Sequence, residues 1–277
     1  MQTLQLLSGQ AIPILGMGTW RMGESISHRQ QEVDALRFGL DLGFSLIDTA
    51  EMYGEGGAEE VIAQAIANRR SEVFLVSKVY PHNASKQGAI AACERSLKRL
   101  KTDYLDLYLL HWRGSIPLSE TLDAFQALQQ AGKIRSYGVS NFDVDDMEEA
   151  IALNGGMNIV TNQVLYNLTR RGIEWSLLPW CQQHQIPIMA YSPIEQGRLL
   201  NHSTLKAIAK KRNITTAQIA IAWLLHQKNV IVIPKSSRIE HIKQNWAALD
   251  IKLDTEKLKL LETAFPRPKK PGVLEML

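Results

Sequence analysis

The chain has 277 residues, a length that fits either two domains of about 150 residues or one α/β barrel of ~250 residues. Hydrophobic residues make up 45% and charged residues 21%, which excludes a disordered or low-complexity protein. The net charge of +3 (31 Lys and Arg against 28 Asp and Glu) is spread without long basic runs, so nucleic acid is not expected as a partner.

The cysteines and the N-terminal segment indicate the compartment. Cys93 and Cys181 are the only cysteines, and each falls on the apolar face of a helical pattern, which favours buried thiols over a disulfide or a metal pair. Residues 1–13 contain neither a basic leader nor a long apolar segment, and no later stretch approaches the ~18 apolar residues of a membrane span. We therefore expect a cytoplasmic protein in a reducing environment, with no membrane partner.

Strand-like runs and helical stretches alternate along the whole chain. Residues 3–13 predict a short hairpin, and the pattern after it is βαβα to the end. The strand-like runs lie at 15–18, 45–48, 73–78, 104–111, 134–140, 159–163, 186–191 and 230–235. No Pro/Gly/Ser-rich linker and no composition shift divides the chain. These eight units favour one domain over 1–277, an α/β protein with a (β/α)₈ TIM barrel, rather than two doubly wound halves.

The helical stretches carry a 3.6-residue apolar period, as at Val33, Leu36 and Leu40. The same period occurs at Val144, Met147 and Ile151, and at Ile239, Ile242 and Trp246. Capping boxes are predicted at Ser27–Gln30, Thr215–Gln218 and Ser237–Glu240, and Gly43 marks a helix end. Beyond the barrel pattern we expect extra helices around 204–211, 216–227 and 254–265, followed by a surface tail at 266–277.

Polar residues stand where each strand-like run ends, which is the end of a (β/α)₈ barrel that carries the active site. These residues are Thr19, Trp20, Asp48, Lys78, His111, Ser140, Asn141, Gln163, Tyr191, Ser192, Lys235 and Ser236. Any one of them could be structural, because strand ends meet water. Their convergence on one mouth favours a functional site.

Asp48, Lys78 and His111 follow three consecutive strands, and Tyr53 lies in the loop just beyond Asp48. An ammonium ~4 Å from a phenol is worth on the order of 4 kcal/mol, enough to lower the tyrosine pKa by up to ~3 units. Lys78 could thus tune Tyr53 as a proton donor, with Asp48 holding the lysine and His111 orienting a carbonyl oxygen. The alternative is a buried Asp–Lys pair that braces the barrel beside a core histidine.

The spacing of histidines, glycines and basic residues shows which other ligand sites the sequence supports. The histidines show neither HExxH nor clustered Cys/His spacing, so no metal is predicted. Gly16 and Gly18 begin a G-x-G, but Arg21 replaces the third glycine of a Rossmann fingerprint, and no P-loop is present. The segment Lys235–Arg238 opens a helix and could bind a phosphate, although a serine that only caps the helix explains it equally well.

Taken together, these residues resemble the aldo-keto reductase family almost end to end, most closely its bacterial methylglyoxal and diketogluconate reductase types. The matching motifs are GMGTW at 16–20, DTAEMYG at 48–54, SK at 77–78, LLH at 109–111, GVSN at 138–141, NQV at 162–164, AYSP at 190–193 and IPKS at 233–236. The resemblance implies NADPH-dependent reduction of aldehydes and ketones in a (β/α)₈ barrel. It also implies a catalytic tetrad of Asp48, Tyr53, Lys78 and His111, with Tyr53 as general acid.

The resemblance assigns further residues to the cofactor and the substrate. Ser140, Asn141 and Gln163 would hold the carboxamide, Tyr191 would stack on the nicotinamide, and Ser192 and Pro193 would line the pyrophosphate path. Lys235, Ser236, Arg238, His241 and Asn245 would surround the 2′-phosphate and adenine, with Gly18, Thr19 and Trp20 also on the cofactor side. Trp20, Tyr80 and Trp112 would form the walls of the carbonyl pocket, with core packing as the alternative for each.

The chain departs from the family pattern at His241, where many members carry an arginine. A mostly neutral imidazole binds a dianion less well than a guanidinium, so we expect NADPH preference sustained by Lys235 and Arg238, with measurable NADH use. The loop at 192–203 and the C-terminal tail are short compared with many animal members, which favours small aldehydes and dicarbonyls as substrates.

Two rival functions stay open at this point. One is a cofactor-binding sensor or partner subunit with little turnover. The other makes Lys78 a Schiff-base nucleophile, which protonation beside Asp48 opposes. A monomer is expected, because the sequence contains no evident self-pairing segment.

Overall fold

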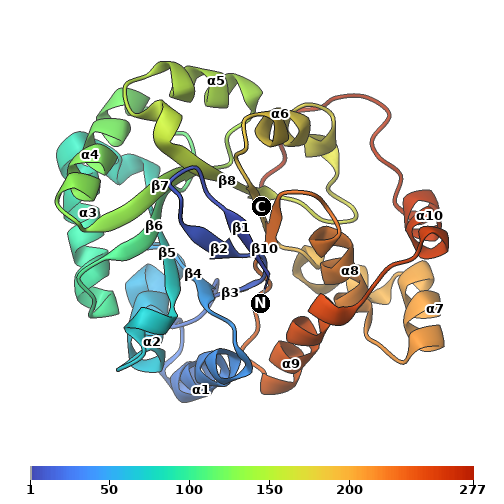
Figure 1. The fold of residues 1–277 in the computed structure, drawn as a ribbon. Coiled ribbons are helices and arrows are strands. Elements are labelled where there is room, and N and C mark those ends of the chain that lie inside the picture. The colour runs from blue at the N-terminus through green and yellow to red at the C-terminus, as the bar shows by residue number, and fades with distance from the viewer. Residues whose placement is uncertain (1) are drawn as a thin grey trace.

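Eight parallel strands form one sheet in the computed structural model, which describes residues 2–277 (Figure 1). The strands are β3 (Gly16–Gly18), β4 (Leu46–Asp48), β5 (Phe74–Val79), β6 (Leu105–Leu110), β7 (Ile134–Ser140), β8 (Ile159–Leu165), β9 (Ile188–Tyr191) and β10 (Val230–Val232). Each pairs with the next in chain order, and bridges between Leu15 and Val232 and between Gly18 and Lys235 close the barrel. All eight predicted runs and the TIM-barrel fold are confirmed.

Closure of the barrel depends on a close backbone approach at Gly18. Its amide donates to the Pro234 carbonyl at 3.0 Å, and a Cβ at this position would lie 2.9 Å from the Ile233 carbonyl oxygen. Any larger residue would push the first and last strands apart, so this glycine has a structural role whatever else it touches.

The helices surround the barrel (Figure 1). They are α1 (Ile26–Leu42), α2 (Gly57–Ala65), α3 (Lys86–Leu100), α4 (Leu118–Gln130), α5 (Val144–Ala152), α6 (Leu177–Gln183), α7 (Ser203–Arg212), α8 (Thr216–Leu225), α9 (Ile239–Ala247) and α10 (Thr255–Ala264). Short 3₁₀ turns follow several strands, among them η1 (Tyr53–Gly56) and η6 (Glu195–Asn201). The predicted helices after β9 and at the C-terminal end are therefore present as α7, α8 and α10.

An antiparallel hairpin, β1 (Thr3–Gln5) and β2 (Ala11–Pro13), lies across the barrel (Figure 1). Leu6 and Ile12 are buried with the side chains that fill the barrel interior, among them Leu46 and Met189. The Ser136 hydroxyl donates to Gln10 Oε1 at 2.6 Å and so fixes the hairpin to β7. The hairpin thus closes the end opposite the strands' C-terminal ends and leaves that second end as the mouth.

The predicted helices are present, but some of their predicted first residues differ from those in the structure. Thr215 and Gln218 form the predicted capping box, and Gly43 ends α1 with a positive φ of 107°. The boxes at Ser27 and Ser237 are wrong, because α1 begins after Ser25 and α9 after Arg238. A hydroxyl one or two residues from the true boundary cannot reach the free backbone N–H groups.

The structure also bears on the predictions for the cysteines, for Ile239 and for membrane spans. Cys93 and Cys181 are buried free thiols, and burial raises the pKa of each to about 12. Ile239, predicted on the apolar face of its helix, is 42% exposed. No helix within residues 2–277 is long and apolar enough to cross a membrane.

Candidate active site

Asp48, Lys78 and Tyr53 form one hydrogen-bonded group at the mouth of the barrel. Asp48 ends β4, Lys78 lies near the end of the neighbouring strand β5, and Tyr53 opens the turn η1 that follows β4. The Lys78 ammonium donates to Asp48 Oδ2 at 2.9 Å and to the Tyr53 hydroxyl oxygen at 3.3 Å. The structure therefore brings these predicted residues together.

Lys78 has no exposed side-chain surface, and its hydrogen-bond partners match the geometry of an ammonium group. Its third hydrogen bond goes to the Thr49 carbonyl at 2.8 Å, so three acceptors meet the three N–H bonds of an ammonium. Burial lowers the Lys78 pKa, and the Asp48 carboxylate opposes that effect by Coulomb attraction and a hydrogen bond. A protonated lysine is a poor nucleophile, and the geometry thus favours a positioning role over Schiff-base chemistry.

Tyr53 is held as a neutral phenol. Burial, followed by the nearby Asp48 carboxylate, raises its pKa well above the ordinary value, which is opposite to the expected lowering by Lys78. At this buried position the cost of desolvating a phenolate is larger than the attraction of the Lys78 ammonium. Because Lys78 donates to the hydroxyl oxygen, the phenolic proton is free to point toward another acceptor.

His111 follows β6 directly and stands beside the tyrosine. The two ring centroids are 5.8 Å apart in an edge-to-face arrangement. Burial, with a smaller effect of the Lys78 charge, lowers the His111 pKa to about 2, so the imidazole is neutral at physiological pH. Its Nδ1 atom is buried and has no hydrogen-bond partner among residues 2–277. A neutral imidazole can donate one hydrogen bond without adding charge to the site.

Two residues predicted to bind the cofactor also form hydrogen bonds to Asp48. The Gln163 amide, from β8, donates to Asp48 Oδ1 at 2.8 Å across the barrel. The Thr19 hydroxyl donates to the Asp48 backbone carbonyl at 2.9 Å and is fully buried. Both carboxylate oxygens of Asp48 are thus engaged, which fixes its orientation toward Lys78.

Aromatic rings extend from His111 toward Tyr80. The centroids of His111 and Trp112 are 4.9 Å apart, and those of Trp112 and Tyr80 are 5.8 Å apart. His111 is buried, Trp112 and Tyr80 are partly exposed, and the three rings form a continuous wall that begins beside Tyr53. Trp20 lies at the end of β3 instead, 38% exposed, with the Arg21 guanidinium 4.4 Å above its ring. The structure brings Tyr80 and Trp112 into contact, and the role of Trp20 in the pocket wall stays a prediction.

The strands β7 and β9 present Asn141 and Tyr191 on the other side of the mouth. The Tyr191 hydroxyl donates to Asn141 Oδ1 at 3.0 Å, and the Asn141 amide donates to the His111 carbonyl at 3.1 Å. Asn141 has a left-handed backbone with φ 59°, a conformation that concentrates at functional sites. The Ser140 hydroxyl donates to the Gln163 carbonyl at 2.8 Å, so these predicted residues form a second connected group.

The loop after β9 contains a buried carboxylate that the sequence analysis missed. Ser192, Glu195 and Gln196 all have positive φ angles of 50–53°. Glu195 is only 4% exposed and accepts hydrogen bonds from Asn167, Arg170 and Arg198. These donors hold the Glu195 pKa below its usual value despite burial. Only the i,i+3 spacing of Glu195 and Arg198 hinted at this network.

The cations after β10 are free of ion pairs. Lys235, Arg238 and His241 make no salt bridge within the described chain, and Arg238 and His241 are exposed. Burial lowers the Lys235 pKa. The Ser236 hydroxyl, not that of Ser237, accepts a hydrogen bond from the Arg238 backbone, at 3.0 Å, and Asn245 is buried on α9. Helix α9 has no side-chain N-cap, so its first N–H groups remain available to an anion.

A parallel (β/α)₈ barrel with a neutral tyrosine, a buried Lys–Asp pair and a neutral histidine at its mouth has the arrangement of an enzyme that protonates a carbonyl oxygen. The family model of the "Aldo/keto reductase family" matches residues 14–265. The chain therefore belongs to the aldo/keto reductase family, as the motifs predicted.

Individual relatives match over nearly the full length. Methylglyoxal reductase YeaE of Escherichia coli (strain K12) is 52% identical, covering 99% of this chain and 98% of its own. Glyoxal reductase of Bacillus subtilis (strain 168) is 32% identical, covering 94% and 91%. The crystal structure of aldo/keto reductase from Klebsiella pneumoniae in complex with NADP and acetate has a TM-score of 0.97 and 52% identity, covering 99% of each chain.

Proposed function

We propose that this protein is an NADPH-dependent reductase of small aldehydes and dicarbonyls, with methylglyoxal as a preferred substrate. The observation that carries the proposal is the 3.3 Å contact between the Lys78 ammonium and the oxygen of a protonated Tyr53 hydroxyl. The similarity to methylglyoxal and glyoxal reductases and to a structure in complex with NADP supports the substrate class and the cofactor.

The four residues at the mouth divide the work of carbonyl reduction. NADPH, when bound, supplies a hydride to the carbonyl carbon. Tyr53 donates its proton to the oxygen that becomes the alcohol, and Lys78, held by Asp48, stabilises the resulting phenolate. His111 donates a hydrogen bond that orients the same oxygen, and its neutrality avoids a second proton donor beside the tyrosine.

The residues that would hold NADPH fit its chemistry. Tyr191 offers a partly exposed ring next to Asn141, which suits a flat nicotinamide, with Ser140 and Gln163 nearby. Ser192 and Pro193 follow directly and would line the pyrophosphate. The unpaired cations Lys235 and Arg238, with the uncapped start of α9, suit a 2′-phosphate.

The cofactor preference is proposed to be moderate. His241 is exposed, and an imidazole cannot bind a phosphate through two parallel hydrogen bonds as a guanidinium does, so Lys235 and Arg238 supply most of the attraction for the 2′-phosphate. We expect NADPH to be preferred and NADH to be used measurably. Equal catalytic efficiency with the two cofactors, or none with NADPH, contradicts this.

Steady-state NADPH oxidation with methylglyoxal or an aromatic aldehyde, followed by absorbance, tests the function. The proposal predicts stoichiometric conversion of carbonyl to alcohol. Tight NADPH binding with no turnover on a panel of aldehydes, ketones and dicarbonyls would favour the sensor alternative. Trapping of a substrate adduct on Lys78 by borohydride would favour a Schiff-base enzyme instead.

The surroundings of the enzyme are proposed on simpler grounds. Two buried free thiols suit a reducing compartment, and we propose the cytoplasm. A small-molecule carbonyl is the proposed partner, with no role for nucleic acid or membrane. The protein is proposed to act as a monomer, and light scattering after size-exclusion chromatography checks this.

A further inference from the structure

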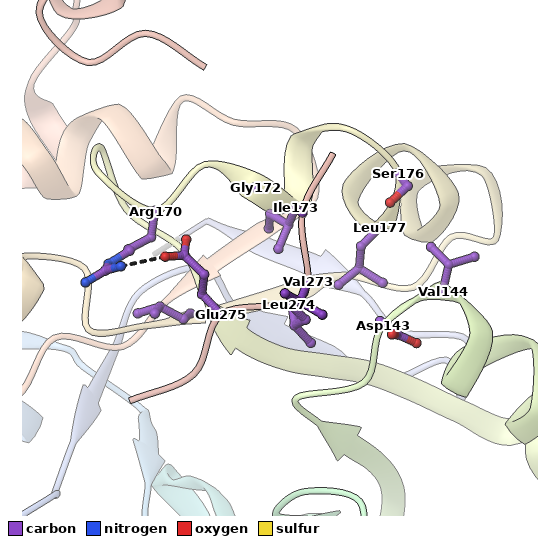
Figure 2. A pocket seen from close by; sticks show the side chains of 12 residues that line it. Asp143, Val144, Arg170, Gly172, Ile173, Ser176, Leu177, Val273, Leu274 and Glu275 are labelled. Carbon is purple, nitrogen blue, oxygen red and sulfur yellow. Dashed lines mark hydrogen bonds and ion pairs between the residues drawn. The ribbon is translucent and has the colours of Figure 1, made fainter. Parts of the chain in front are cut away.

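The C-terminal segment, residues 266–277, lies on the surface as predicted and is fixed there by hydrogen bonds and ion pairs. At its start, Trp175 Nε1 donates to the Pro268 carbonyl at 2.9 Å, and Arg267 pairs with Glu174 at 3.0 Å. Further on, Leu274 is half-buried beside a small cavity between the segment, α5 and α6 (Figure 2). The segment therefore returns from α10 to the barrel.

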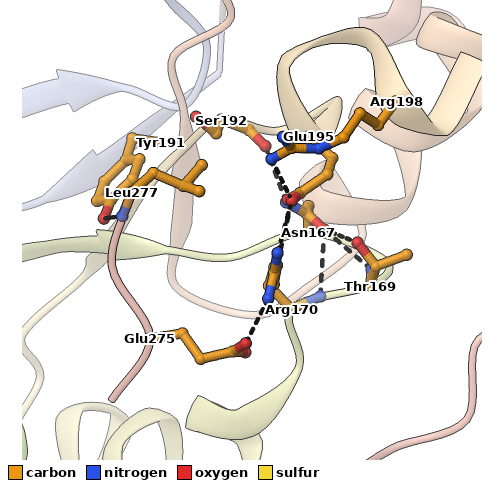
Figure 3. Close-up of polar contacts among 9 residues, drawn as sticks. All are labelled: Asn167, Thr169, Arg170, Tyr191, Ser192, Glu195, Arg198, Glu275 and Leu277. Atoms are coloured by element: carbon orange, nitrogen blue, oxygen red, sulfur yellow. Dashed lines mark hydrogen bonds and ion pairs between the residues drawn. The ribbon is translucent and has the colours of Figure 1, made fainter.

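The end of the segment reaches the active-site mouth. The Leu277 backbone N–H lies 3.4 Å from the Tyr191 hydroxyl (Figure 3). That hydroxyl in turn donates to Asn141. The C-terminal segment thus lies beside the ring proposed to stack on the nicotinamide.

Arg170 joins this segment to the loop after β9. Its Nη1 atom contacts Glu275 Oε1 at 2.5 Å, while Nε and Nη2 both donate to Glu195 Oε1, at 3.1 and 3.0 Å (Figure 3). The planar guanidinium therefore binds one carboxylate on each of two sides. A lysine, with a single charged nitrogen, could not hold both.

Glu195 connects the same cation to the backbone that is proposed to cover the pyrophosphate. Asn167 donates to Glu195 Oε2 at 2.7 Å and to the Ser192 carbonyl at 2.9 Å. The left-handed conformations at Ser192 and Glu195 are unfavourable for these residue types and are retained because this network fixes them. The loop at 192–198 and the C-terminal segment are consequently held by one connected set of charges.

We propose that Arg170 is a positioning residue that couples NADPH binding to the shape of the carbonyl pocket. This inference rests on the proposed function, since it places the cofactor on Tyr191 and Ser192. NADPH orders the loop at 192–198 and, through Glu195, Arg170 and Glu275, also orders residues 272–277. Bound NADPH therefore strengthens carbonyl binding, and a bound carbonyl strengthens NADPH binding by the same factor.

Glu275→Gln removes one charge of the link at a half-exposed position and leaves the loop network intact. An ion pair of this exposure is worth up to roughly a fivefold change in an equilibrium. We expect a three- to fivefold higher KM for methylglyoxal, with kcat changed less than about twofold. Arg170→Lys should raise the KM for methylglyoxal similarly and should also weaken NADPH binding in fluorescence titrations. Glu262→Gln is the matched control, because Glu262 pairs with the neighbouring Arg171 at 2.8 Å and does not touch this link.

Hydrogen exchange supplies a readout that does not depend on turnover. In the native protein NADPH should slow exchange in both the 192–201 and 266–277 peptides. In Glu275→Gln it should slow only the first, and Glu262→Gln should behave like the native protein. An unchanged KM for methylglyoxal, or NADPH protection of 266–277 that persists in Glu275→Gln, overturns the coupling. If the native protein neither binds NADPH nor reduces methylglyoxal, the proposed function fails, and that failure is visible before any variant is compared.

Discussion

Two clusters of charged residues at the barrel mouth differ in burial and in ion pairing. The catalytic cluster (Asp48, Tyr53, Lys78 and His111) is inward-facing, and its ion pair is almost fully buried, with Lys78 at 0% and Asp48 at 2% exposure. The basic cluster (Lys235, Arg238 and His241) follows β10, makes no ion pair within residues 2–277 and is partly or fully exposed. The charges of the first cluster are paired within the protein, whereas the cations of the second cluster make no ion pair within the described chain and are open to an anionic ligand.

This contrast determines how each side should respond to substitution. Removing one member of the buried group leaves a charge or polar atom without a partner in a low dielectric, which is costly for both stability and chemistry. Removing an exposed cation affects ligand binding alone, and by a modest factor.

Lys78→Met should have the largest effect. It leaves the Asp48 carboxylate buried and unpaired, so we expect a loss of about 3–5 kcal/mol in the free energy of unfolding. Activity toward methylglyoxal should fall by about 10³-fold, because Tyr53 loses the cation that stabilises its phenolate. Urea denaturation and NADPH oxidation measure the two losses.

The double variant Lys78→Met/Asp48→Asn separates bracing from catalysis. It removes both charges, so most of the stability should return while activity stays low. Recovery of activity together with stability would mean that the pair only braces the barrel.

His111 should make stability depend on pH. Its folded-state pKa is about 2, below the ~6.5 of an unfolded histidine, so the unfolded chain binds the proton first as pH falls. Its contribution is therefore complete above pH ~6.5 and is lost below it, by about 3 kcal/mol at pH 4.5. His111→Gln should flatten the curve of unfolding free energy against pH by one proton over this range. An unaltered slope would show that His111 titrates normally in the folded protein.

Arg238→Gln tests the basic cluster. Loss of one charge-assisted hydrogen bond to a phosphate should raise the KM for NADPH about tenfold, corresponding to roughly 1.5 kcal/mol, with little change for NADH. Thermal stability should be unaffected, in contrast to the Lys78 variant. Equal increases in the KM for NADPH and the KM for NADH would show that Arg238 does not contact the 2′-phosphate.

His241→Arg should give the smallest effect, and in the opposite direction. A guanidinium at this exposed position should lower the KM for NADPH by about threefold and increase the preference over NADH. Competition assays with both cofactors detect a change of this size. A variant with unchanged preference would indicate that residue 241 does not reach the phosphate.

The same contrast explains what the sequence could predict. Asp48, Lys78 and His111 were found because parallel strands bring their C-terminal ends to one mouth, and the strand-like runs were clear. Tyr53 followed from its place five residues beyond Asp48. The direction of its pKa shift was wrong, because burial depth depends on the folded surroundings and not on the neighbours in sequence.

Other features left no local pattern to recognise. Arg170 and Glu195 are 25 residues apart, and Glu275 is 105 residues from Arg170, so only the folded chain brings them together. Ser237 was assigned as a cap because its spacing to Glu240 fits, but α9 begins after Arg238. Helix boundaries vary by one or two residues, which is enough to change which hydroxyl meets the backbone.

The central claim is that the hydroxyl of Tyr53 delivers the proton in carbonyl reduction. Tyr53→Phe removes only that group, so single-turnover reduction of methylglyoxal at saturating NADPH is the most direct measurement. We expect a rate about 10²–10⁴-fold lower than that of the native protein, with the dissociation constant for NADPH changed less than about twofold. A variant that reduces methylglyoxal at the native rate would contradict it.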